Sequence, residues 1–414
     1  MRSEGGGVAF GQEAPTRLAG CFSPHTSLLT PHGVTMTLPV SIQALADYHP
    51  ERVRTALEQL LAPLGGMAVF VRPGQKVLIK PNLLAGKPPE KAVTTHPEIV
   101  RQVILLAQGA GGIVSVGDSP GIGSPESVAR KCGIMTVVEE TGARFAPFIE
   151  SVPISVHEGT FHQLEVAREV LDAEVIINLP KLKTHQMMGF TGAVKNMFGA
   201  VVGMRKVRLH LQAGADPAFF ALMLLELAER FPPALSIMDA VVGMEGNGPG
   251  SGDPVQVGAL LASPHPLALD TAATTLVGLS GQQLWTQRVA RDSGRPGSHL
   301  EEVTIIGPPL ASLRPKKFRP APSLDVGFGL PAPIKRTLRN ALTARPEIAS
   351  NCVRCGDCVR HCPPHAMTLD ERGIRIDDHR CIRCFCCQEL CPHGAILTRQ
   401  GTLLRVAAFL GGRR

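Results

Sequence analysis

The chain is poor in aromatic residues, which make up 4% of its 414 positions and include one Trp and one Tyr. Proteins that hold single-stranded nucleic acid stack the bases on aromatic side chains, so this scarcity argues against that function. The sequence also lacks any uninterrupted apolar run of about 18 residues, the length that crosses a bilayer as a helix. We therefore expect no nucleic-acid partner and no membrane span.

An apolar signal-peptide segment is missing as well, since the chain opens on MRSE and then runs into glycines. We therefore expect a cytoplasmic location. Cysteine is scarce over most of the length: of 11 cysteines, nine lie within residues 352–391, and only Cys21 and Cys132 lie elsewhere. In a reducing compartment this local density indicates metal or redox chemistry rather than structural disulfides.

The charge is distributed in the same uneven way. Lys and Arg exceed Asp and Glu by 42 to 35, a formal net charge of +7, and residues 335–414 alone hold 14 basic and 7 acidic side chains. The excess therefore coincides with the cysteine-rich part of the chain. We interpret it as an offset for bound anionic clusters, or as a surface for an acidic redox partner, rather than as a DNA-binding surface.

Composition and periodicity divide the chain into five parts. Residues 1–35 are rich in Gly, Pro, Ser and Thr, which predicts a disordered extension, and Met36 is an alternative start directly before the first patterned segment. Residues 36–307 form a patterned domain, 308–346 a Pro-rich basic linker, 347–400 a compact Cys-rich module and 401–414 a tail.

Within the large domain, short apolar runs typical of fully buried strands occur at residues 76–79, 113–116, 175–177, 235–238 and 303–306. Helical patterns lie between them, for example at 97–107 and 125–131, and a further helix is expected from Tyr48 onward. This alternation predicts βαβ units, and hence a mainly parallel open sheet with helices on both faces. The expected fold class is α/β for this domain, followed by a small α+β module.

The strongest signal is a repeated cysteine motif with the spacing C-x2-C-x2-C-x3-C-P. It comprises Cys352, Cys355, Cys358 and Cys362, and again, 29 residues later, Cys381, Cys384, Cys387 and Cys391. Pro363 and Pro392 close the two runs. The duplication resembles bacterial two-cluster ferredoxins and covers about residues 348–400. The resemblance implies two [4Fe-4S] clusters in a small α+β fold.

In bacterial two-cluster ferredoxins, three closely spaced thiolates hold one cubane and the fourth Cys of each run binds the other cluster. The resemblance therefore assigns cluster 1 to Cys352, Cys355, Cys358 and Cys391, and cluster 2 to Cys381, Cys384, Cys387 and Cys362. Zinc is the weaker alternative, because zinc sites usually consist of separated Cys pairs without the closing proline. The ninth cysteine of the module, Cys386, is expected to be a thiol that binds no cluster.

Polar residues follow four of the predicted strands, where open α/β sheets bind their ligands. The candidates are Lys80, Asn82, Asp118, Lys181, Lys183, His185 and Asp239, together with Lys195 and Asn196 in the glycine-rich segment 189–203. Their four lysines would make a cleft cationic, which favours an anionic small molecule such as a carboxylate or a phosphate. The turn at residues 117–124 matches neither a dinucleotide fingerprint nor a P-loop.

We expect the lysines, Asn82, Asp118 and Asn196 to bind the substrate, and His185 or Asp239 to supply a proton. Each residue also has a structural alternative. His185 could cap a loop, Asp118 could form a turn, and Asp239 could be a buried helix cap. The segment 189–203 could be a ligand-binding lid or a tightly packed segment, since glycine permits close approach of the backbone in either case.

Three segments of the large domain resemble the family known as domain of unknown function 362. They read KPNLL at residues 80–84, NLPKLKTH at 178–185 and GAVKN at 192–196. The similarity runs from about residue 41 to 307, and members of that family often carry a C-terminal ferredoxin module. The resemblance supports this domain organisation and the importance of the strand-end residues, but it supplies no substrate.

These observations lead to one favoured function and two alternatives. The favoured one is an iron–sulfur oxidoreductase, in which two clusters exchange electrons with a soluble redox partner, donor or acceptor, and with an anionic substrate in the large domain. The first alternative is a non-catalytic electron-transfer subunit that docks on a partner enzyme. The second is an enzyme without redox chemistry whose clusters are structural. No flavin, haem or nicotinamide motif is visible in the sequence.

Overall fold

The computed structural model describes residues 37–401, apart from 122, 157, 204, 207–208, 210–215, 281–283, 323–343 and 390. The extension expected over residues 1–35 lies outside the described residues, as does most of the linker expected over 308–346 and of the tail expected over 401–414. The remaining predictions fall on residues that the structure describes.

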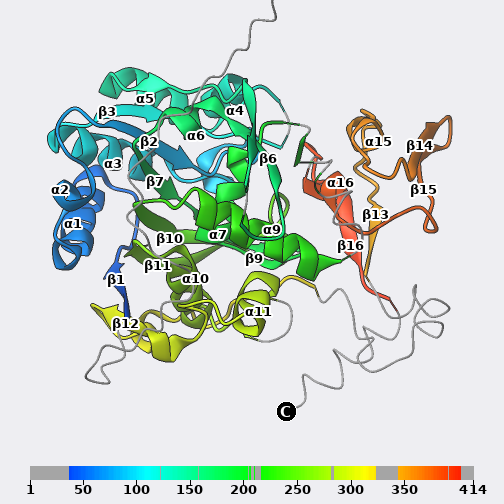
Figure 1. Cartoon of the computed structure of the whole chain (residues 1–414). Helices are drawn as coiled ribbons and strands as arrows, with labels where there is room; N and C mark the ends of the chain where they lie inside the picture. Colours follow the sequence, from blue (N-terminus) through cyan, green and yellow to red (C-terminus); the bar gives the residue numbers. More distant parts are fainter. Residues whose placement is uncertain are drawn as a thin grey trace, which may run out of the picture. The chain divides into compact units, whose positions relative to one another are not determined.

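A mixed sheet forms the centre of the large domain, in the order β12-β1-β11-β10-β7-β2-β3-β4, with β8 and β9 attached beside β10 (Figure 1). Most neighbouring strands are parallel, but β11 runs antiparallel to both β1 and β10. The strands are β1 (Leu38–Ala44), β2 (Lys76–Pro81), β3 (Ile113–Val116), β4 (Arg144–Phe145), β7 (Val175–Leu179), β8 (Lys181–His185), β9 (Gly189–Thr191), β10 (Leu235–Glu245), β11 (Asp253–Ser263) and β12 (Val303–Ile306).

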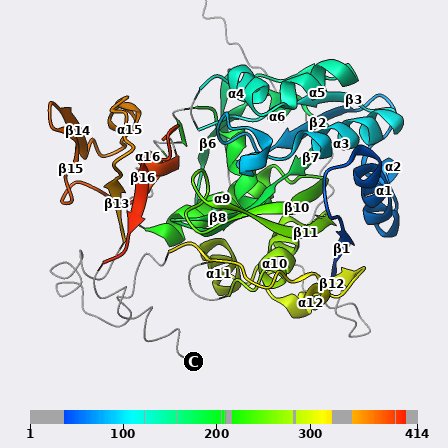
Figure 2. The ribbon, with the colours of Figure 1, turned by 180° about the vertical axis from the view of Figure 1, so that it is seen from behind.

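Helices bury both faces of this sheet, which can be followed from the two sides in Figures 1 and 2. Strand β2 shows how: Val77 and Ile79 pack with α1, α3 and α5, whereas Leu78 packs with α7 and α9 on the opposite face. The helices of the domain are α1 (Pro50–Leu61), α2 (Met67–Phe70), α3 (Pro97–Gly109), α4 (Pro125–Lys131), α5 (Ile134–Thr141), α6 (Arg168–Asp172), α7 (Ala193–Asn196), α9 (Pro217–Arg230), α10 (Pro266–Leu276), α11 (Trp285–Asp292) and α12 (Leu310–Leu313). A strand buried on both faces reads as a continuous apolar run, which is why the sequence reveals β2.

The expected α/β class is confirmed, and the five strands expected from apolar runs are present as β2, β3, β7, β10 and β12. The other five strands of this sheet, β1, β4, β8, β9 and β11, were not expected. β11 returns antiparallel from the glycine-rich turn after β10, and β1 fills the place between β11 and β12. A separate hairpin of β5 (Ser151–Ser155) and β6 (Gln163–Ala167) was also not expected.

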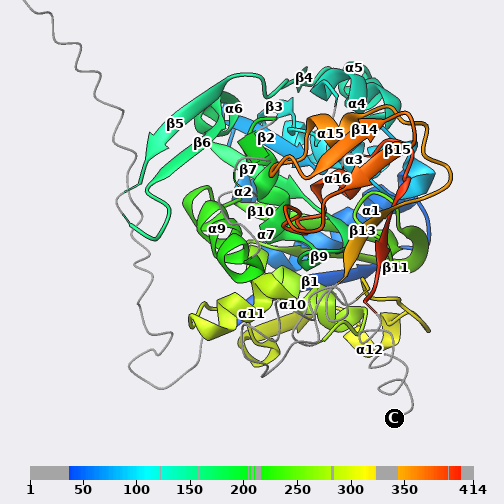
Figure 3. The same ribbon diagram turned by 90° about the vertical axis from the view of Figure 1, so that its right-hand side faces the viewer.

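The cysteine-rich module is built from two short antiparallel strand pairs and two single-turn helices. All of these elements are labelled in Figure 1, and all except the last strand are also labelled in Figure 3. β14 (Met367–Asp370) pairs with β15 (Gly373–Ile376), and β13 (Arg345–Ile348) pairs with β16 (Ile396–Arg399). The helices are α15 (Asp357–Arg360) and α16 (Cys386–Glu389). The module thus combines strands with helices, and it is α+β as expected.

Candidate functional site

The strand-end residues named above do not form one open group. They divide into an inner network around Lys80 and an outer network around Asp239, while His185 and Lys195 lie apart from both. All of them except Asn82 and Lys195 are buried. The contacts within the two networks determine how much lysine charge is left to bind a ligand.

In the inner network, Lys80 at the end of β2 forms a buried ion pair with Asp118, with 2.7 Å between Nζ and Oδ1. The backbone N–H of Leu83 donates to the other carboxylate oxygen at 2.8 Å. Burial lowers the pKa of Lys80, and the neighbouring Asp118 opposes that shift. Lys80 therefore has its carboxylate partner inside the protein.

Amide side chains complete the inner network. Asn196 accepts from Asn82 and donates to Asn178, each at 2.8 Å, and its carbonyl oxygen accepts from Lys80. Lys183 donates to Oδ1 of Asn82 at 2.8 Å and to the carbonyl oxygen of Val93 at 2.7 Å. The network thus ties the loop after β2 to β8 and to α7.

Gly199 explains part of the glycine density in segment 189–203. A Cβ at this position would lie 1.8 Å from Oδ1 of Asp118 and 2.5 Å from Nζ of Lys80. The backbone of residues 197–200 therefore runs directly against the ion pair, where any side chain would collide. Of the two interpretations of this segment, its close contacts agree with tight packing.

The outer network joins Lys181 at the start of β8 to Asp239 in β10 through an ion pair of 2.7 Å. Tyr48 donates to Oδ1 of Asp239 at 2.8 Å and accepts from Lys181 at 2.9 Å, and the backbone N–H of His96 donates to Oδ2 at 2.9 Å. The rings of Tyr48 and His96 stack at 3.5 Å with an interplanar angle of 5°. These two rings are only partly buried, so this network reaches the surface.

Burial dominates the ionisation of the outer network. It lowers the pKa of His96 to about 4, so this imidazole is neutral at pH 7. Burial and the Asp239 carboxylate raise the pKa of Tyr48 well above its usual range. At neutral pH the network therefore consists of one compensated ion pair beside a neutral phenol and a neutral imidazole.

His185 and Lys195 serve other contacts. Nδ1 of His185 accepts from the backbone N–H groups of Met187 at 3.1 Å and Met188 at 3.2 Å, where the chain turns from β8 to β9. This is the loop-capping role that we named as the alternative for this residue. Nζ of Lys195 lies 5.7 Å from the centroid of the Phe198 ring.

Sequence reasoning missed Asp270, Tyr48 and His96. Asp270 on α10 is 1% exposed and accepts from the backbone N–H groups of Ala193 and Val194 at the start of α7. Burial raises its pKa to about 7, against the effect of these two donors. A lone acidic residue in an apolar helical stretch was a usable signal for Asp270, and the single Tyr of the chain was one for Tyr48.

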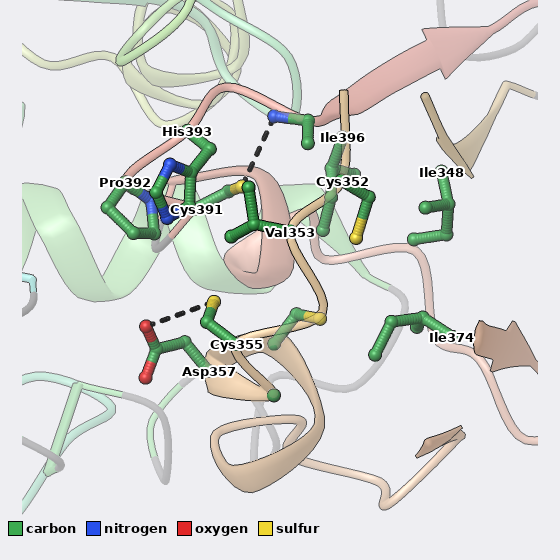
Figure 4. A pocket seen from close by; sticks show the side chains of 13 residues that line it. Ile348, Cys352, Val353, Cys355, Asp357, Ile374, Cys391, Pro392, His393 and Ile396 are labelled. Carbon is green, nitrogen blue, oxygen red and sulfur yellow. Dashed lines mark hydrogen bonds between the residues drawn. The ribbon is translucent and has the colours of Figure 1, made fainter. Parts of the chain in front are cut away.

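The cysteine-rich module contains two separate pockets, and each is lined by four cysteines. The first is lined by Cys352, Cys355, Cys358 and Cys391, and the second by Cys362, Cys381, Cys384 and Cys387. Figure 4 shows the first pocket, where Ile348, Ile374 and Ile396 supply apolar walls around the sulfur atoms. Among the described residues, no three His, Cys, Asp or Glu side chains lie close enough together to hold a single metal ion.

The two pockets repeat the same backbone geometry at an offset of 29 residues. Arg354 and Arg383 both adopt left-handed backbone conformations, with φ of 57° and 58°. The N–H of Ala366 donates to Sγ of Cys362, and the N–H of Ala395 donates to Sγ of Cys391, each at 3.2 Å (Figure 4 shows the second). Such N–H groups stabilise thiolate ligands of an iron–sulfur cluster.

These features fit a [4Fe-4S] cluster in each pocket. Four sulfur atoms surround an apolar space, and backbone donors already point at one sulfur of each set. Without metal, burial and the neighbouring thiols raise the pKa of Cys358 to about 11, so iron has to displace a proton when it binds. Cys386 is 4% exposed and lines neither pocket.

Comparison with known proteins agrees with this description. Residues 77–275 match the family described as Domain of unknown function (DUF362), and residues 351–395 match a 4Fe-4S dicluster domain. The chain is 37% identical over 313 residues to the thylakoid-associated protein sll1697 of Synechocystis sp., an alignment that covers 74% of this chain and 95% of that protein. No described helix is both long and apolar enough to span a bilayer.

Solved structures show weaker similarity. The lactate racemase apoprotein from Thermoanaerobacterium thermosaccharolyticum aligns with a TM-score of 0.38 and 13% identity over 60% of this chain and 58% of its own. A protein from Thermotoga maritima aligns with a TM-score of 0.31 and 14% identity over 47% of this chain and 51% of its own. The chain therefore spans less than two thirds of either structure. On the sequence matches, the chain is an iron–sulfur protein and belongs to the Domain of unknown function (DUF362) family, with a 4Fe-4S dicluster domain toward its C-terminal end.

Proposed function

We propose that this protein transfers electrons through two [4Fe-4S] clusters and exchanges them with a soluble redox partner. Cluster 1 is held by Cys352, Cys355, Cys358 and Cys391, and cluster 2 by Cys362, Cys381, Cys384 and Cys387. The observation that carries the proposal is the division of eight cysteines into two apolar pockets with four sulfur atoms each. Each bound cluster would supply one-electron redox chemistry.

The protein's own residues contribute the surroundings of the clusters. The N–H groups of Ala366 and Ala395 donate to ligand sulfurs, which stabilises the thiolate form and the reduced state of a cluster. Apolar side chains line both pockets and would limit the contact of a bound cluster with water.

Metal analysis after anaerobic purification tests the proposal. Two cubanes require about eight iron and eight sulfide per chain, and a preparation that holds only zinc would overturn the assignment. The variant Cys391→Ser should lose the same electron paramagnetic resonance (EPR) signal as Cys352→Ser, and not the signal lost in Cys381→Ser. The matched control is Cys386→Ser, which should keep both clusters because this sulfur lines neither pocket.

A second candidate is an oxidoreductase that acts on an anionic small molecule at the strand ends. In this function a proton is supplied by His185 or Asp239. The substrate is bound by Lys80, Asn82, Asp118, Lys181, Lys183, Lys195 and Asn196. One observation favours it: five of these residues meet in the inner network, and the outer network reaches the surface at Tyr48 and His96.

The contacts of the lysines favour the first candidate. Lys80 and Lys181 are each paired with a carboxylate, and Lys183 donates to two oxygens, so an anion would have to displace partners that are already in place. The variants Lys183→Met and His185→Gln distinguish the two functions. Loss of turnover with an anionic substrate while both clusters persist would favour the oxidoreductase, and unchanged electron transfer would favour the carrier.

A further inference from the structure

The two cluster pockets differ in their contact with solvent, although their backbones repeat. In the first set Cys355 is exposed and Cys352 and Cys391 are half-buried. In the second set all four cysteines are buried, with relative exposures between 7% and 9%. A cubane bound in the first pocket would therefore meet water at the Cys355 corner, whereas the sulfur ligands of one in the second would be less exposed to water.

One position at which the two halves of the internal repeat carry different residues accounts for part of this difference in solvent exposure. Gly356, with φ of 77°, lines the first pocket, and its counterpart 29 residues later is Phe385, with φ of 59°, which lines the second. The Phe385 side chain is 1% exposed. A bulky residue rarely adopts positive φ, so the ring is retained against a backbone preference for glycine.

The large domain contacts the buried side of the module. Gln388, adjacent to Cys387 and 1% exposed, donates to Oδ1 of Asn247 at 2.6 Å. The same oxygen accepts from Thr398 at 3.2 Å and from Gln186 at 3.0 Å, and Gln186 is the neighbour of His185 in the chain. Helix α16, which carries the cluster 2 ligand Cys387, is therefore joined through Asn247 to the residue that follows β8.

From these observations we propose that the clusters have different positions in the electron path, and this inference rests on the proposed function. Cluster 1 is the outer cluster, which exchanges electrons with the external one-electron carrier. Cluster 2 is the inner cluster, sealed from water by Phe385 and joined to the large domain through Gln388 and Asn247. Bound by these two sets of cysteines, the clusters would supply one-electron transfer, with the external carrier as the reductant or, in the reverse direction, as the oxidant.

Relaxation of each cluster's EPR signal by a water-soluble paramagnetic complex, nickel–EDTA, tests this order in the full-length holoprotein. The two signals are assigned beforehand with the variants Cys352→Ser and Cys381→Ser. We expect the complex to shorten the relaxation time of cluster 1 more than that of cluster 2 in the unaltered protein. Equal enhancement, or stronger enhancement at cluster 2, overturns the inference.

The variant Phe385→Gly sharpens the test, because glycine suits the left-handed backbone at this position. We expect the relaxation enhancement of cluster 2 to rise to that of cluster 1, while the iron content stays unchanged. His365→Gly is the matched control: His365 also has positive φ, at 50°, and is exposed, so its loss should leave both enhancements as they were. An unchanged cluster 2 in Phe385→Gly contradicts the inference, whereas absence of the clusters from the unaltered protein contradicts the proposed function itself.

Discussion

Breaking the buried ion pair of Lys181 and Asp239 should destabilise the large domain strongly, and removing both charges together should cost less than the two single changes added. Their side chains are 1% and 0% exposed and the charged atoms are 2.7 Å apart. Removing one member of such a pair leaves an uncompensated charge in a place that water does not reach, which costs about 3–5 kcal/mol.

The remaining contacts set the order of the single variants. In Lys181→Met the Asp239 carboxylate keeps donors from Tyr48, His96 and Val241, so we expect a loss near the low end, about 3 kcal/mol. In Asp239→Asn the ammonium keeps Tyr48 as its acceptor, so we expect about 5 kcal/mol. The double variant should lose no more than the milder single one, about 3 kcal/mol, which gives a coupling of about 5 kcal/mol or more.

Urea unfolding under anaerobic conditions measures these changes, with Trp285 fluorescence as the reporter. This residue is the single Trp of the chain and lies on α11, so it reports the large domain and not the cysteine-rich module. Free energies follow from the transition midpoint and slope. The control is Arg130 and Glu139, an ion pair of 3.1 Å with side chains 64% and 57% exposed, whose coupling should stay below about 1 kcal/mol. A coupling for Lys181 and Asp239 that is no larger than this control would refute the reasoning.

Three further changes test other parts of the structure. Gly199→Ala should destabilise the large domain by about 1–3 kcal/mol, because its Cβ would overlap Asp118, whereas Gly109→Ala, where a Cβ meets nothing within 4 Å, should be neutral or stabilising in the same unfolding assay. Asp270→Asn should flatten the pH dependence of the free energy of unfolding. The pKa of Asp270 in the folded protein, about 7, lies above the ordinary 3.8, so the unaltered protein loses on the order of 4 kcal/mol of stability as the pH rises from about 4 to 7. An identical pH profile in the variant would contradict this. Asn247→Ala should weaken the attachment of α16 by about 1 kcal/mol for each lost hydrogen bond, seen as faster amide hydrogen exchange there, while Asn351→Ala, which removes a single bond to the carbonyl oxygen of His393, should leave α16 unchanged.

Much of this fold could be predicted from the sequence because the central strands are buried on both faces. Short apolar runs such as KVLI at 76–79 are typical of strands inside a sheet, and the five runs occur as β2, β3, β7, β10 and β12. β11 was missed because residues 253–256, at its start, are exposed or half-buried, so its continuous apolar run is confined to residues 259–262 near its end. The antiparallel return after β10 is a property of the turn and not of the strand residues.

The sequence identified individual residues of the candidate site but not the contacts between them. The lysines at 80, 181 and 183 could be named from their positions after strands. Their partners could not, because Tyr48 lies 191 positions from Asp239 and His96 lies 143 positions from it, and no local pattern reports such contacts. For the same reason the sequence indicated a cationic group, whereas two of its ammonium charges are compensated by carboxylates.

The separation of these partners along the chain also has a consequence for how the protein folds. Lys80 reaches Asp118 across 38 positions and the carbonyl of Asn196 across 116, while Lys181 reaches Tyr48 across 133. Contacts between such distant segments form late, because closing long loops is entropically unfavourable until other contacts have been made. Until then hydration stabilises each lysine and each carboxylate more than an incompletely formed ion pair does. We therefore expect the strands to pair while the side chains at their ends are still hydrated. The buried ion pairs should form last, and only in a correctly assembled sheet.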